Sequence, residues 1–250
     1  MFIDTHCHLS YEDYDDIDFI IKENRLAGVS KIIVSGCSER WIEESLLLAE
    51  KYEDVYVTLG YHPSEVDNVN DELLEILKEK LLHEKVVGLG EIGLDYYYGK
   101  DNKEKQLYLF EKQLKIAEDM GLVVVIHSRD ATEDTIKLLK KYNVKGVIHC
   151  FSGSVETARI YVKMGYKLGI GGVVTFKNSK LYEVVEDVGL QNIVLETDSP
   201  YLTPVPFRGQ KNSSKYIPLI AECIAKILNV SLDEVSSVTT KTACDVFDLR

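Results

Sequence analysis

The sequence has no paired cysteine spacing, no long apolar run and no excess of positive charge, and each absence narrows the function. Its five cysteines are scattered and odd in number, which fits a reducing compartment better than a disulfide framework. No apolar stretch approaches the roughly 20 residues of a membrane span, and the first residues lack the basic and apolar regions of a signal peptide. We therefore expect a cytoplasmic protein with no membrane partner.

The charge balance is acidic. The chain carries 29 basic and 41 acidic residues, for a formal net charge of -12. This counts against tight, extended binding to nucleic acid, because basic surfaces usually grip phosphate backbones. It does not exclude a site for one phosphate or a strand end, since bound divalent cations reverse the local field.

Short β-branched runs alternate with amphipathic helical patterns along all 250 residues, as in a parallel α/β sheet. The expected strands are residues 2–4, 31–35, 55–59, 86–90, 122–126, 146–148, 166–170 and 193–195. The expected helices include residues 40–51, 72–82, 103–120, 132–142, 217–228 and 232–246. About eight strands is the number that a closed barrel needs. We predict an α/β protein with a single domain over residues 1–250, folded as a (β/α)8 TIM barrel.

Ligand-type side chains fall where the expected strands end. Five of the six histidines follow this rule, together with one glutamate and one aspartate. The residues are His6, His8, His62, Glu91, His127, His149 and Asp198. Because the carboxyl ends of parallel barrel strands open on one face, residues far apart in sequence converge there. We predict metal ligands at His6, His8, Glu91, His127, His149 and Asp198.

The number of ligands suggests two ions. His6 and His8 are two apart on a strand and point to the same side, while Cys7 points away into the core. Six ligands exceed the need of one tetrahedral ion, so we predict two divalent cations about 3.5 to 4 Å apart. Imidazole and carboxylate ligands suit zinc, manganese, iron or nickel, and magnesium is kept as a further candidate. Glu91 is the expected bridging ligand.

These residues lie in seven short motifs that follow one another along the chain. They are Asp4-Thr5-His6-Cys7-His8, Gly60-Tyr61-His62-Pro63, Gly90-Glu91-Ile92-Gly93-Leu94-Asp95-Tyr96-Tyr97, Ile126-His127-Ser128-Arg129-Asp130-Ala131, His149-Cys150-Phe151-Ser152-Gly153, Leu195-Glu196-Thr197-Asp198-Ser199-Pro200-Tyr201-Leu202 and Arg208-Gly209. Over almost its whole length the chain resembles the TatD family of metal-dependent deoxyribonucleases, which are amidohydrolase-like barrels.

The resemblance implies a division of the ligands. His6, His8, Glu91 and Asp198 would hold one ion, and Glu91, His127 and His149 the other. It also implies hydrolysis of nucleic-acid phosphodiesters. The chain departs from the family pattern near its carboxyl end, where Ser213-Ser214 replaces an acidic residue and a proline, and Thr242 replaces an asparagine. Both departures put substrate contacts in doubt more than catalysis.

Several residues carry roles beyond ligation. Asp198 is the candidate general base and acid, because a carboxylate beside an activated water can accept its proton and return it; the alternative is a plain ligand or a loop cap. His62 could orient phosphate or water, or simply stabilise a turn. Arg208 could clamp a phosphate oxygen, or be a solvated loop cation. Tyr96 and the two tyrosines after it could stack on a base, or form a packed wall.

The leading hypothesis is a two-metal phosphodiesterase that cleaves DNA from a strand end, as an exonuclease does, and acts as a monomer. A second hypothesis is an ester or amide hydrolase on the same scaffold, such as an aminoacyl-tRNA deacylase or a cyclic amidohydrolase, because a metal pair also polarises a carbonyl. A third is a metal-dependent scaffold that has lost catalysis. That hypothesis predicts a missing ligand, and none is missing.

Overall fold

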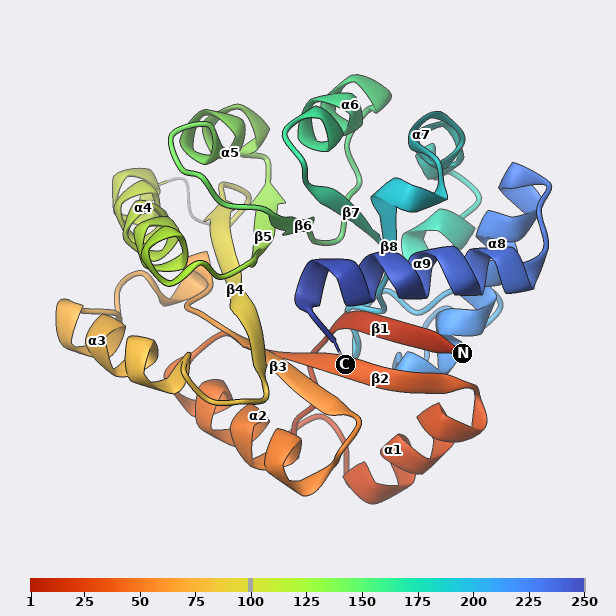
Figure 1. Ribbon diagram of the computed structural model, residues 1–250, viewed down its shortest axis with the longest axis horizontal. Coiled ribbons are helices and arrows are strands. Elements are labelled where there is room, and N and C mark those ends of the chain that lie inside the picture. Colours follow the sequence, from red (N-terminus) through yellow and green to blue (C-terminus); the bar gives the residue numbers. More distant parts are fainter. Residues whose placement is uncertain (99–100, 250) are drawn as a thin grey trace. The chain divides into compact units, whose positions relative to one another are not determined.

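The computed structural model describes residues 1–98 and 101–249. Its strands form one sheet in chain order, from β1 to β8 (Figure 1). They are β1 (Phe2–Cys7), β2 (Val29–Gly36), β3 (Val55–Leu59), β4 (Val86–Asp95), β5 (Val124–Arg129), β6 (Gly146–Ile148), β7 (Lys167–Ile170) and β8 (Ile193–Leu195). Neighbouring strands run parallel in each pair whose register is known. This order confirms the predicted (β/α)8 fold class.

Helices alternate with the strands. They are α1 (Ile17–Leu26), α2 (Glu39–Lys51), α3 (Asp71–Lys80), α4 (Lys103–Met120), α5 (Thr132–Leu139), α6 (Val155–Lys163), α7 (Leu181–Val188), α8 (Ile217–Leu228) and α9 (Leu232–Phe247). A one-turn 3₁₀ helix, η1 (Pro63–Glu65), follows β3. In residues 1–98 and 101–249, no helix is long and apolar enough to cross a bilayer.

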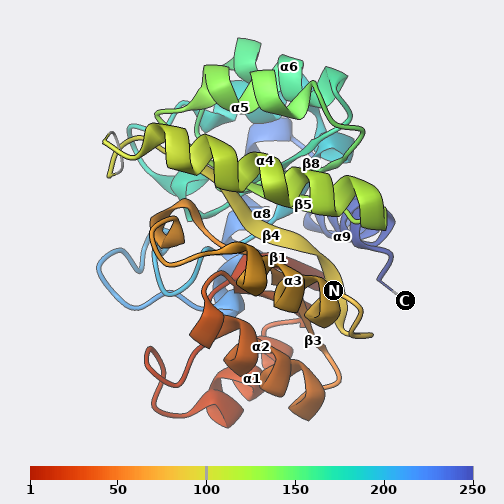
Figure 2. The ribbon, with the colours of Figure 1, turned by 90° about the vertical axis from the view of Figure 1, so that its left-hand side faces the viewer.

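The chain divides into two compact units. One consists of Met1–Val34 with Cys150–Arg250, and the other of Ser35–His149. The first unit contains β1, β7, β8 and the last two helices. The second contains β3 to β6, and its longest helix, α4, packs on β4 (Figure 2).

Local sequence explains where the elements begin and end. Four helices begin after a residue whose side chain accepts a hydrogen bond from a backbone N–H in the first helical turn, which stabilises the helix start. These capping residues are Ser38, Asn70, Ser154 and Ser231. Helix α4 ends at Gly121, whose left-handed conformation costs glycine little. The strand residues are mostly apolar and buried.

Four strands extend past the ends that the sequence predicts. β1 continues to Cys7, so that His6 lies inside it, and β2 covers Val29–Gly36. β4 continues past residue 90 to Asp95, and β5 continues past residue 126 to Arg129, so Glu91 and His127 lie inside strands and not at their ends. The extensions of β4 and β5 pair with each other, for example Gly93 with His127. A Cβ at position 93 would lie 1.9 Å from the His127 carbonyl oxygen. Glycine at this position therefore allows the two ligand-bearing strands to approach.

Candidate metal centre

The first group of candidate ligands lies in the first unit and consists of His6, His8 and Asp198, here called the aspartate cluster. The Nε2 atoms of the two histidines are 3.4 Å apart. The Asp198 Oδ1 atom lies 3.9 Å from the first of them and 3.5 Å from the second. Both imidazoles are buried. Two ring nitrogens and a carboxylate oxygen therefore converge, as the strand-end placement predicts.

Backbone contacts between the ends of β1 and β8 hold this cluster. The Asp198 N–H donates to the His6 carbonyl at 3.0 Å, and the His8 N–H donates to the Ser199 carbonyl at 2.7 Å. Asp198 itself has a left-handed backbone, with φ of 53°. This conformation is uncommon outside glycine but more accessible to Asp and Asn than to other residues.

Asp4 binds Thr197, the residue before Asp198 in the aspartate cluster. The sequence did not single out Asp4. It is fully buried, and its Oδ2 and Oδ1 atoms accept hydrogen bonds from the Thr197 hydroxyl at 2.6 Å and the Thr197 N–H at 3.0 Å. Burial raises the pKa of its carboxyl from 3.8 to about 7, although hydrogen bonds from Thr197 and Ser214 oppose the rise. Ser214, which is part of the departure from the family pattern, thus contacts Asp4 next to the aspartate cluster.

Asp4 makes the stability of the metal-free protein depend on pH. The folded state holds the Asp4 proton up to a pH near 7, whereas the unfolded chain releases it near 4, so this contribution to stability is present at low pH and lost as the pH rises through that window. Replacing Asp4 with asparagine keeps a neutral group and should flatten the decline. Urea unfolding of both proteins between pH 4.5 and 7.5 measures the effect; parallel pH profiles would contradict it.

The second group lies in the second unit and consists of Glu91, His127 and His149, here called the glutamate cluster. One oxygen of Glu91, Oε1, lies 2.7 Å from His127 Nδ1 and 3.7 Å from His149 Nε2. One ligand atom from each residue lies within 4.8 Å of the others. Burial lowers the pKa of His127, but hydrogen bonds to Asp95 and Glu91 outweigh it and raise that pKa to about 9. The carboxylate is the common partner of the cluster.

His62 lies beside the glutamate cluster, with its Nε2 atom 3.9 Å from Glu91 Oε1. Its Nδ1 atom accepts a hydrogen bond from the Ser64 N–H at 3.1 Å. A backbone N–H can only donate, so a neutral His62 carries its proton on Nε2. This geometry leaves Nε2 of a neutral His62 as a donor, as the predicted orienting role requires. The Nδ1 contact also caps η1, as the alternative role in a turn requires.

Asp95 is a further residue that the sequence did not identify as part of the site. Its Oδ2 atom lies 3.3 Å from His127 Nε2, and its Oδ1 atom accepts hydrogen bonds from the backbone N–H groups of Tyr97 and Tyr98. A carboxylate on the second nitrogen of a histidine fixes the ring and makes the first nitrogen a better ligand.

The three consecutive tyrosines, Tyr96 to Tyr98, lie in different surroundings. The Tyr96 hydroxyl donates to Asp134 at 2.9 Å, and Lys103 lies 4.7 Å above its ring. Of the three consecutive tyrosines, Tyr97 and Tyr98 are exposed, at 55 and 78 %. The Arg129 guanidinium lies 4.0 Å from the Tyr97 ring centre and 4.9 Å from that of Tyr98. The Arg129 guanidinium therefore stacks on these two rings.

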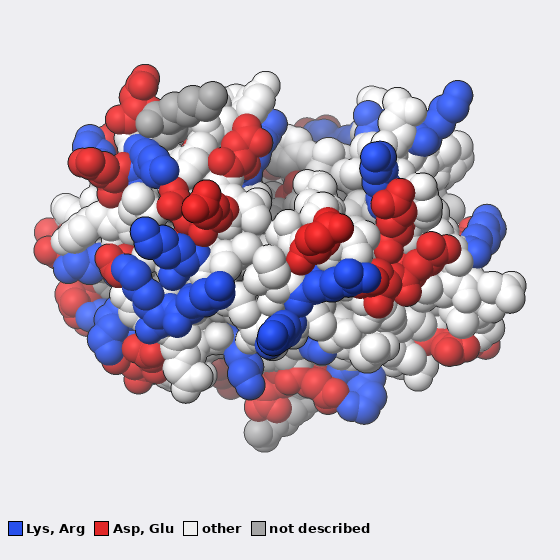
Figure 3. All heavy atoms as spheres, turned by 90° about the horizontal axis from the view of Figure 1, so that it is seen from above, with Lys and Arg blue, Asp and Glu red and all other residues white. Residues whose placement is uncertain are grey.

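Arg208 lies in the first unit, on the loop after β8. Its side chain is exposed, and its guanidinium lies 3.7 Å above the Phe176 ring. Stacking holds the planar group while its edge keeps its N–H donors. On the face shown in Figure 3, acidic and basic side chains are interspersed.

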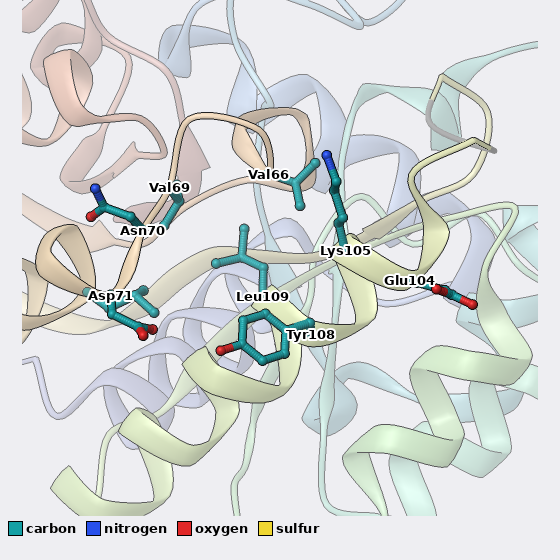
Figure 4. Close-up of a pocket in the computed structure, with 9 residues that line it drawn as sticks. Val66, Val69, Asn70, Asp71, Glu104, Lys105, Tyr108 and Leu109 are labelled. Carbon is teal, nitrogen blue, oxygen red and sulfur yellow. The ribbon is translucent and has the colours of Figure 1, made fainter.

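A hollow of about 300 Å³ lies between α4 and the segment that follows η1 (Figure 4). Its lining is mainly apolar, with Asn70, Asp71, Glu104 and Lys105 among its polar residues. The residues that line it include none of the candidate ligands. The hollow is therefore not part of either ligand cluster.

The donor set of both clusters fits a divalent cation. Imidazole nitrogens and carboxylate oxygens are ligands of zinc, manganese, iron and nickel. Each cluster combines histidine with a carboxylate that offsets positive charge. The structure thus brings three predicted ligands together in each unit, and their union in one centre stays a prediction.

Comparison with known proteins gives a consistent result. The family model described as "TatD related DNase" matches residues 3–248. An uncharacterized metal-dependent hydrolase of Bacillus subtilis, YabD, is 40% identical over 255 residues, which is 100% of both chains. The Escherichia coli hydrolase YjjV is 34% identical over 99% of this chain and 98% of its own.

Solved structures resemble the chain over its full length. The crystal structure of YjjV, a TatD homologue from Escherichia coli, matches with a TM-score of 0.94 and 33% identity, covering 100% of this chain and 98% of that one. An organophosphorus hydrolase from Deinococcus radiodurans has a TM-score of 0.65 at 11% identity, covering 98% and 92%. The second likeness concerns the fold alone.

Proposed function

Because this chain belongs to the TatD family of metal-dependent hydrolases, we propose that it cleaves phosphodiester bonds in DNA with water activated by two divalent cations. The observation that carries the proposal is the pair of largely buried clusters, each with a carboxylate and histidines whose ligand atoms lie close together. The family match spans both units, and so supports joining the two clusters in one centre.

In the proposed centre, His6, His8 and Asp198 would hold one ion, and His127 and His149 the other. Glu91 is shared, and Asp95 orients His127 from outside. A metal pair lowers the pKa of water and stabilises charge on the reacting phosphate. Zinc, manganese, magnesium, nickel and iron are all candidates.

The chain supplies the proton transfer and the substrate contacts. Asp198 accepts the proton of the attacking water and returns it to the leaving oxygen. His62 donates from Nε2 to a phosphate oxygen or to the water. Arg208 contacts a non-bridging phosphate oxygen through the free edge of its stacked guanidinium.

Exposed aromatic side chains support a nucleic-acid substrate. Tyr97, Tyr98 and Arg129 form a stack next to Asp95, which contacts the glutamate cluster. Unpaired bases stack on such surfaces in a sequence-tolerant way. The stacking role considered for Tyr96 therefore moves to Tyr97, because Tyr97 is exposed whereas Tyr96 is half-buried and its hydroxyl is bonded to Asp134. A strand end fits an acidic protein better than a long duplex.

Replacing Tyr97 with alanine should lower kcat/KM on a single-stranded oligonucleotide by about 5- to 100-fold, since stacking contributes roughly 1 to 3 kcal/mol per base. Turnover of a small phosphodiester without a base should not change. Tyr108→Ala is the matched control, because Tyr108 is also exposed but lines the hollow of Figure 4. Equal losses on both substrates would remove Tyr97 from base recognition.

Replacing Arg208 with alanine should lower kcat/KM by about tenfold or more while metal content stays intact, because charged hydrogen bonds contribute roughly 1.5 to 3 kcal/mol. Arg159→Ala, which breaks a surface pair with Asp187, is the control and should leave the kinetics unchanged. Unaltered kinetics of the Arg208 variant would show that it is a solvated loop cation.

A substrate panel separates this function from the alternatives. Purified, metal-analysed protein is given labelled single-stranded DNA, RNA, aminoacyl-tRNA and small cyclic amides. We expect cleavage of DNA. Turnover of aminoacyl-tRNA or amides alone would favour the ester or amide hydrolase, and bound metal without any turnover would favour a non-catalytic scaffold.

We also propose that residues 1–250 fold as one domain that acts as a monomer in the cytoplasm. The family match over both units supports the first point. The odd number of cysteines, without paired spacing, supports a reducing compartment. Light scattering gives the oligomeric state, and a single cooperative unfolding transition is expected.

A further inference from the structure

Two glutamines of α4 each bind both the backbone N–H and the backbone carbonyl of one other residue through the side-chain amide. The Gln113 side chain accepts a hydrogen bond from the Tyr61 N–H at 2.8 Å and donates one to the Tyr61 carbonyl at 3.0 Å. The Gln106 side chain makes the same pair of bonds with Asp95, at 2.8 and 2.9 Å. A primary amide offers both a donor and an acceptor, so each glutamine clamps one residue through two bonds.

The clamps are built into a rigid and buried surface. Gln113 and Gln106 are 0 and 2 % exposed. They are seven residues apart, or about two helical turns, so they project from the same face of α4, roughly 10 Å apart along its axis. Breaking either clamp would leave a backbone N–H and carbonyl without these partners in a buried setting, which is costly. The helix therefore holds two separate segments at a fixed spacing.

The clamped residues adjoin two different groups of the candidate centre. Tyr61 directly precedes His62, whose ring is held on its other side by Ser64. Asp95 directs one carboxylate oxygen at His127 while the other oxygen is occupied by backbone N–H groups. Each segment thus has its main chain fixed by a glutamine and its side chain directed towards the glutamate cluster.

We propose that Gln113 and Gln106 are positioning residues with separate targets. Gln113 sets the place where His62 presents its Nε2 donor, and Gln106 holds the Asp95 carboxylate against His127. The geometric part of this inference stands on the contacts above, while its consequence for turnover rests on the proposed function. A general role in stability would instead affect both segments whenever α4 is perturbed.

The test compares Gln113→Met, Gln106→Met and Leu114→Met in the full-length protein. Methionine keeps the length of glutamine but removes both hydrogen bonds. Leu114 is fully buried on the same helix, so its variant reports on repacking alone. The chain has six histidines, which makes their ring signals in NMR spectra easy to assign. Gln113→Met should move the His62 signals, Gln106→Met those of His127, and Leu114→Met neither.

Metal affinity, measured by competition with a chelator, gives an independent reading. Gln106→Met should weaken zinc or manganese binding by up to about 10-fold, because it loosens Asp95 without removing it, and losing such an outer partner outright costs about 10- to 100-fold. Gln113→Met should leave binding unchanged and lower kcat/KM on the substrate found by the panel. Should a methionine variant fail to fold, Gln→Glu at the same position keeps the volume and the acceptor.

The outcomes separate this inference from the proposed function. A wild-type protein that binds no metal rejects the proposed function, while the histidine ring signals still decide whether the clamps act on His62 and His127. Ring signals that move alike in both glutamine variants, or in neither, overturn the positioning role.

Discussion

Replacing Asp198 with asparagine should lower kcat by about 10² to 10⁴, the usual contribution of general acid–base catalysis, while bound metal largely persists. Asparagine removes the charge and the proton acceptor but keeps one oxygen that can face His6 and His8. It also tolerates the left-handed backbone of this position, with φ of 53°, as well as aspartate does. The substitution therefore tests chemistry without a change of backbone.

Metal content and kcat are measured on the same preparation, with Asp187→Asn as the control. Asp187 pairs with Arg159 on the surface, and its substitution should change neither quantity. Full activity with full metal would reject the proton transfer by Asp198. Loss of metal in proportion to activity would reduce Asp198 to a ligand.

Replacing Glu91 with glutamine should lower both the metal content and the activity, unlike Asp198→Asn, which should keep its metal. Glu91 Oε1 is the shared partner of His127 and His149, and it is the only carboxylate proposed to contact both ions. Removing its charge should reduce bound metal from about two ions to about one per chain. Loss of one ion's several kcal/mol of transition-state stabilisation corresponds to a fall in kcat of about 10³-fold or more.

Elemental analysis and kinetics check this result against Glu111→Gln, which alters a glutamate on α4 that pairs with Lys141. The control should keep two ions and normal turnover. A Glu91 variant that retains both ions would contradict a bridging role, even if its activity falls.

The sequence predicts the fold well because the strand and helix patterns are local, whereas the union of the six ligands in one centre stays a prediction. β3, β6 and β8 begin and end where the sequence predicts, as does α4. β4 was predicted to end at residue 90, because the polar Glu91 interrupts an apolar run. In the structure the strand continues, since pairing with β5 satisfies the backbone as far as Asp95 and Arg129. Backbone pairing between strands cannot be predicted from the pattern of apolar and polar side chains alone.

The supporting residues could not be predicted, because their partners are distant in sequence. Asp4 contacts Thr197 across 193 positions, and Gln113 contacts Tyr61 across 52. Nothing in the sequence around a buried glutamine says which backbone group it binds. The choice between Tyr96 and Tyr97 likewise depends on contacts with Asp134, Lys103 and Arg129.

The central claim is that the two clusters form one two-metal centre, and a crystal structure of the metal-loaded protein with anomalous scattering tests it most directly. The account predicts two ions about 3.5 to 4 Å apart, with Glu91 between them. His6, His8 and Asp198 should lie around one ion, and His127 and His149 around the other, at ligand distances of about 2.0 to 2.2 Å for zinc. Ions bound in separate cavities, or a single ion held by one cluster alone, would contradict it.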